Sequence, residues 1–90
     1  EAMLTELTRD EAAWVRACAT WCLSESQLPP ASRDELLKAS VADGNPVVRE
    51  IALVSLNRKA PAVAARLLGD RLKDDAPLVR KQAAALSAAV

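Results

Sequence analysis

Apolar residues recur along this 90-residue chain at spacings of three and four, the period of a helix that buries one face. Short segments containing Pro, Gly or Asp interrupt the pattern. The pattern therefore predicts an all-α fold in which six helices form three antiparallel pairs. The expected helices lie near residues 2–9, 12–25, 33–42, 46–57, 62–73 and 77–89.

The same motif returns three times along the chain. Ala13-Trp14-Val15-Arg16 is followed 33 residues later by Pro46-Val47-Val48-Arg49, and 31 residues after that by Pro77-Leu78-Val79-Arg80. A fixed period of this size is typical of stacked helical hairpins. We expect one domain, residues 1–90, built of repeats at about 1–28, 29–60 and 61–90.

The turns carry residues that end and start helices. Ser32 followed by Glu35 predicts a capping box at the start of the second repeat, just after two prolines that stop the preceding helix. In the next turn Gly44 is expected to end one helix, and Asn45 to cap the helix that opens with Pro46.

The turn and the start of each second helix resemble the HEAT-repeat family. The second repeat matches best, from Asp43 through Arg49 to Ala52 and Leu56, whereas the first repeat has Trp14 where an aliphatic residue is usual. The resemblance implies a right-handed αα-superhelix, a HEAT-like solenoid of three antiparallel helix pairs. It also implies that the second helices line a concave surface that binds a protein partner.

One Asp and one Arg recur six residues apart in every repeat. A carboxylate at the end of the first helix lies near the start of the second, where an Arg fork can bridge to the turn or to the neighbouring repeat. The resemblance to HEAT repeats likewise implies a structural ladder; direct contact with a partner is the alternative. The ladder residues are Asp10, Arg16, Asp43, Arg49, Asp74 and Arg80.

Composition argues against catalysis. The chain contains no His, the commonest general acid or base and metal ligand, and we find no nucleophile–base pair or Gly-rich phosphate loop. We therefore expect a non-enzymatic protein without cofactor or metal. Cys18 and Cys22 lack the further ligands of a zinc site and are interpreted as packing residues in a reducing compartment.

The expected partner-binding surface centres on Trp21, which lies on the side of its helix away from Val15, Ala19 and Leu23. A large apolar group left on the groove side is a candidate anchor. Trp14, in contrast, is expected in the core or against a preceding repeat, because it aligns with Val47 and Leu78. The partner-binding residues are predicted to be Trp21, Thr20, Glu50, Leu53, Val54, Asn57 and Lys81.

Charge is divided along the chain. Residues 1–45 carry 4 basic and 8 acidic side chains, a net charge of −4, whereas residues 46–90 carry 8 basic and 4 acidic ones, a net charge of +4. This division favours head-to-tail self-association through exposed repeat ends. Nucleic-acid binding by the basic half is an alternative, although Asp residues interleave with its cations and it has no aromatic residue. Those cations are Arg58, Lys59, Arg66, Arg71, Lys73 and Lys81.

No apolar stretch approaches the roughly 18 residues that span a bilayer. We expect a cytoplasmic protein, and the Ala-rich helices with Arg in excess over Lys favour a bacterial source. The first residue is Glu and neither end reads as a polar cap, so we expect a piece of a longer array, or an accessory domain of a larger HEAT-repeat enzyme.

Overall fold

A computed structural model describes residues 6–26 and 28–88, and these residues form helices and turns without a strand. The helices with complete bounds are α2 (Ala13–Ser24), α3 (Pro30–Val41), α4 (Pro46–Lys59), α5 (Pro61–Arg71) and α6 (Pro77–Ala88). The all-α prediction is confirmed. Most of the helix expected near 2–9 lies outside the described residues, of which 6 and 7 are helical.

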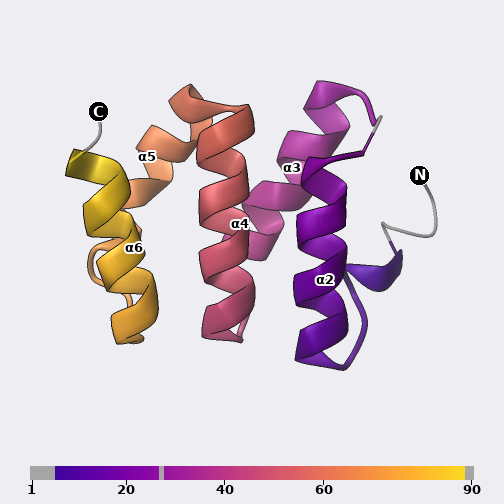
Figure 1. Cartoon of the computed structure of the whole chain (residues 1–90), viewed down its shortest axis with the longest axis horizontal. Coiled ribbons are helices and arrows are strands. Elements are labelled where there is room, and N and C mark those ends of the chain that lie inside the picture. Colours follow the sequence, from indigo (N-terminus) through magenta and orange to yellow (C-terminus); the bar gives the residue numbers. More distant parts are fainter. Residues whose placement is uncertain (1–5, 27, 89–90) are drawn as a thin grey trace.

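The helices form two layers (Figure 1). Helices α2, α4 and α6 stand side by side in one row, and α3 and α5 cross behind them. The molecule measures 34 × 25 × 15 Å, and the two ends of the chain lie toward opposite ends of its long axis. Each second helix therefore contacts the second helix of the next repeat.

Proline sets the start of the helices better than the predicted capping box did. Helix α3 begins at Pro30, three residues before the predicted start, and no side chain caps it, so the Ser32–Glu35 capping box is wrong. The fixed φ of proline suits the first helical turn, and its missing N–H needs no partner there. The predicted Asn45 cap is confirmed, because its side chain accepts the Val47 amide at 2.9 Å.

Aspartate rather than glycine organises the turns between the paired helices. Helix α3 ends at Val41, and Gly44 does not adopt a positive φ, so its expected role as the helix-ending residue is wrong. Instead, Asp10, Asp43 and Asp74 each accept the backbone amide two residues later, at 2.8, 2.8 and 2.9 Å. Each carboxylate is thereby held in the same pose in its turn.

The core runs continuously through the helices of both layers. Small residues such as Ala52, Ala64 and Ala83 let the helices approach closely, which agrees with a chain poor in aromatic side chains. The buried cluster is Leu23, Leu37, Val41, Ala52, Leu53, Leu56, Ala64, Leu68 and Ala83.

Arg16 and Arg49 join each repeat to the next through one repeated set of contacts. The Nη1 of each donates to the backbone carbonyl of its own turn, Arg16 to Asp10 at 2.9 Å and Arg49 to Asp43 at 2.8 Å. The Nε and Nη2 of Arg16 then bind both carboxylate oxygens of Asp43, at 2.8 and 3.0 Å. Arg49 binds Asp74 in the same way, at 2.9 and 2.8 Å. This Arg–Asp fork fixes both distance and angle, and so the offset between consecutive hairpins.

The second fork is the more enclosed of the two. The Asp74 side chain is 2% exposed and also accepts a bond from Arg71 at 3.0 Å. Arg49 additionally reaches Asp75 at 2.9 Å, although the Asp75 side chain is 93% exposed. Two cations on one buried carboxylate offset the cost of taking its charge out of water.

The forks also shift the protonation equilibria. Burial alone raises the pKa of the Asp43 and Asp74 carboxyls, because it penalises their charged form. The hydrogen bonds from Arg16 and Arg49, a turn amide and the guanidinium charges outweigh burial, so the pKa of each carboxyl lies below its usual value. The same hydrogen bonds raise the pKa of both guanidinium groups.

We expect Asp74→Ala to lower the free energy of unfolding by about 3 kcal/mol, because removing one partner of a buried ion pair strands the other charge. The matched control, Asp75→Ala, removes an exposed carboxylate from the same Arg49 and should change stability by less than about 0.5 kcal/mol. Urea denaturation followed by the helical circular dichroism signal measures both. Equal losses in the two variants would contradict the dominance of the Asp74 fork.

Acid is expected to weaken the first fork. The stabilisation from Asp43 is fully present above the pKa of the unfolded carboxyl, about 3.9, and is lost as the pH falls through the lower folded-state pKa. The free energy of unfolding should therefore drop below about pH 4 in the wild type. Asp43→Asn, which keeps an oxygen for the Asn45 amide, should show a shallower drop, and an unchanged slope would refute the assignment.

Candidate interaction surface

One face of the α2–α4–α6 row, which we term the open face, is left uncovered by the second layer. On α2 its exposed residues are Trp14, Cys18 and Trp21, spaced by four and three positions as expected for one side of a helix. The same positions recur on α4 and α6. The open face comprises Trp14, Cys18, Trp21, Val47, Ile51, Val54, Leu78, Gln82 and Ala85.

The open face is mainly apolar. Trp14 is 73% exposed and forms a row with Val47 and Leu78, the equivalent residues of the next two repeats, both of which are exposed. Trp21 is 46% exposed and leads the parallel row through Val54. Apolar side chains that gather on a surface in this way are typical of interaction sites.

Two open depressions lie between neighbouring helices of this row. The first, of about 270 Å³, is lined by Ala13, Trp14 and Ala17 of α2 together with Asn45 and Val47. The second, of about 210 Å³, lies between α4 and α6, and its lining is Glu50, Leu78, Lys81, Gln82 and Ala85. Side chains of a partner can therefore enter between the helices at two successive repeats.

A charged group borders the open face at Trp21. The Arg58 guanidinium lies over the indole, 5.1 Å from the ring centroid, and also bonds to Glu25. Lys59 approaches the same carboxylate at 3.9 Å. Trp21 thus combines an apolar surface with a cation held against its ring, a combination enriched among residues that dominate binding energy.

The predicted partner-binding residues fall into three groups. Trp21 and Lys81 are exposed, while Glu50, Val54 and Asn57 are partly buried. Thr20 and Leu53 are fully buried, so their assignment to an accessible surface is wrong.

Helix rotation explains the error. Thr20 donates its hydroxyl proton to the Arg16 carbonyl at 2.7 Å and lies 3.4 Å from the Ser40 hydroxyl of the next repeat. Leu53, its equivalent on α4, belongs to the core. One residue turns a helix by about 100°, so the predicted surface was rotated onto the side that packs against the following hairpin.

The sequence analysis missed Trp14, Val47 and Leu78. The expectation that Trp14 lies in the core is wrong, because its indole is largely exposed. A usable signal was the neighbouring apolar column that contains the buried Val48 and Val79. Two adjacent helical positions cannot both face the same core, so one of the two columns had to face outward.

Cys18 and Cys22 are free and exposed, so the prediction that they pack inside the molecule is wrong. Within the described ranges, no group of three or more His, Cys, Asp or Glu side chains is placed to hold a metal ion. No helix of the described ranges has both the length and the apolar character that crossing a membrane requires.

A family model described as HEAT repeats matches residues 1–89. A search of curated proteins and a search of solved structures returned no significant match.

The two indoles offer a direct test of the open face, because the chain contains no Tyr or Phe. We expect the emission of water-exposed tryptophan from both Trp14→Phe and Trp21→Phe. Quenching by acrylamide should be stronger in Trp21→Phe, since it retains the more exposed Trp14. Short-wavelength emission that resists acrylamide in either variant would show that the remaining indole is covered.

Proposed function

The chain belongs to the HEAT-repeat family, and from that membership we propose that it is a non-enzymatic scaffold or protein-interaction module that binds a protein partner on its open face. HEAT repeats generally mediate protein interactions. The proposal rests above all on the row of Trp14, Val47 and Leu78, which leaves one exposed apolar side chain per repeat. In the family's terms, this is the surface lined by the second helices.

The shape of the open face suits a protein ligand. Its depressions lie at two successive repeats, so an apolar segment laid across α2, α4 and α6 can insert one side chain into each. The rings of Trp14 and Trp21 supply large, rigid contact areas. Glu50 and Lys81 line the second depression and can orient polar groups of the ligand.

The character of the same side chains supports a binding role over catalysis. Apart from Cys18, the open face consists of aliphatic, indole and amide groups, which do not move protons at neutral pH. A role as an accessory domain of a larger HEAT-repeat enzyme is compatible with such a face, since the chemistry would then lie elsewhere in that protein.

Nucleic-acid binding by the basic half has less support. Arg49 and Arg71 are engaged with Asp74, which reduces the positive charge available for phosphates. Both tryptophans lie on α2, in the acidic half, so the cations of α5 and α6 have no stacking partner beside them. A cytoplasmic location is supported by the two free, exposed thiols, and a bacterial source by composition alone.

Affinity capture with matched variants tests the proposal. A true partner should be retained by the wild type and by the control Leu72→Ala, which removes an exposed apolar side chain outside the open face. Trp14→Ala/Val47→Ala should retain at least about tenfold less of it, since buried aromatic anchors carry much of the binding energy. Circular dichroism verifies that all three proteins are folded.

Two outcomes would overturn the open-face proposal. One is equal retention of the captured proteins by the open-face variant. The other is capture that nuclease abolishes and that falls steeply with salt, as expected for phosphate contacts.

A further inference from the structure

The third ladder arginine, Arg80, is held like the first two but has no carboxylate in its fork. Its Nη1 donates to the Asp74 carbonyl at 2.6 Å, the equivalent of the contacts that anchor Arg16 and Arg49 to their own turns. In the described part of the chain, no Asp or Glu bonds to its Nε or Nη2, and the residue is exposed. The guanidinium is thus oriented for a fork that this chain does not complete.

The surface around Arg80 is the side that a following hairpin would cover. Leu72 of this end is 43% exposed, whereas Val41, its equivalent one repeat earlier, is 4% exposed. Ala84 is exposed, whereas the equivalent Thr20 and Leu53 are fully buried against the next repeat. This end of the stack therefore presents an uncovered packing surface together with an uncompleted fork.

The opposite end presents the complementary group. Asp10 accepts the Ala12 amide at 2.8 Å, so its carboxylate is posed like those of Asp43 and Asp74, which do receive forks. No arginine side chain of the described ranges forks onto it. Cys22 is exposed at this end, although the equivalent Ser55 is fully buried.

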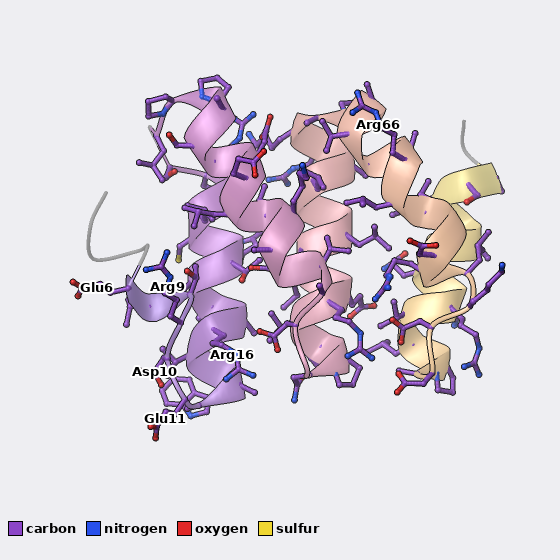
Figure 2. All side chains as sticks on the ribbon, turned by 180° about the vertical axis from the view of Figure 1, so that it is seen from behind. Glu6, Arg9, Asp10, Glu11, Arg16 and Arg66 are labelled. Atoms are coloured by element: carbon purple, nitrogen blue, oxygen red, sulfur yellow. The ribbon has the colours of Figure 1, made fainter. Side chains whose placement is uncertain are left out.

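Charge favours the same pairing of ends. Figure 2 shows the side chains of Glu6, Asp10 and Glu11 gathered with Arg9 at the N-terminal end of the stack. Exposed Lys73 and Lys81 accompany the exposed Arg80 at the other end. These local signs agree with the net charges of −4 for residues 1–45 and +4 for residues 46–90.

We propose that copies of this chain associate head to tail, with Arg80 of one copy forking onto Asp10 of the next. The α5–α6 hairpin of the first copy then packs beside α2 of the second, as α3–α4 packs beside α5–α6 within the chain. Such a contact joins two different surfaces, so it leaves a free end on every assembly and growth continues past the dimer. The open face is not consumed, so this inference stands or falls separately from the proposed function.

Sedimentation velocity over a range of concentrations tests the proposal with single variants. The wild type should grow in size with concentration, and salt should weaken that growth. Arg80→Glu and Asp10→Asn should each associate at least about tenfold more weakly, because each removes one half of the fork. Asp10→Asn keeps an oxygen that accepts the turn amide, and Arg66→Glu, a charge reversal on exposed Arg66 of α5, should assemble like the wild type.

The decisive measurement is the equimolar mixture of Arg80→Glu and Asp10→Asn. Only the intact Asp10 of the first and the intact Arg80 of the second can meet, so the mixture should form a dimer and stop there. The proposal is overturned by a wild type that stays monomeric up to about 1 mM, or by a mixture that stays monomeric at concentrations where the wild type assembles. It is also overturned if either blocking variant assembles like the wild type, or if Arg66→Glu disrupts assembly equally.

A thiol measurement provides a second readout that does not depend on replacing Asp10. In a Cys18→Ala background, Cys22 is the chain's remaining thiol and lies at the end to be covered. Its rate of reaction with a thiol reagent should fall several-fold as protein concentration rises, and this protection should be absent in Arg80→Glu. A rate independent of concentration would overturn the proposal.

Discussion

The bidentate contact between an arginine of one repeat and the turn aspartate of the next sets the geometry on which the rest of the structure depends. Hairpins that met through apolar contacts alone could slide past one another, because such contacts are not directional. The Arg16–Asp43 and Arg49–Asp74 forks add a fixed distance and angle. Each guanidinium also bonds to its own turn, so consecutive hairpins share one offset.

A constant offset turns repeated residues into rows. Trp14, Val47 and Leu78 occupy equivalent positions, and they line up across three parallel helices because each repeat is displaced from the last in the same way. A single exposed apolar side chain would be unremarkable on a protein surface, whereas three in register form a continuous patch. The interaction surface is thus a product of the ladder as much as of the side chains that compose it.

The same regularity makes the two ends of the stack unlike its middle. A residue that is buried between repeats becomes exposed when no neighbour follows, as the contrast between Val41 and Leu72 shows. The ladder behaves likewise, with an acceptor at Asp10 and a donor at Arg80 that the chain does not pair. Stacked repeats therefore carry complementary ends wherever the fork between them is directional.

The sequence by itself determined the helices, the repeat period and the recurring Asp and Arg, because helical periodicity and turn chemistry are local properties of the chain. It predicted the Asn45 cap but misplaced the start of α3, where Pro30 suits the first turn better than Ser32 suits the cap. Only the tertiary structure decided which apolar column faces outward, so Trp14 was assigned to the core and Thr20 to the surface. One residue rotates a helix face by about 100°, and the packing of neighbouring hairpins, which no local pattern encodes, selects the face that stays open.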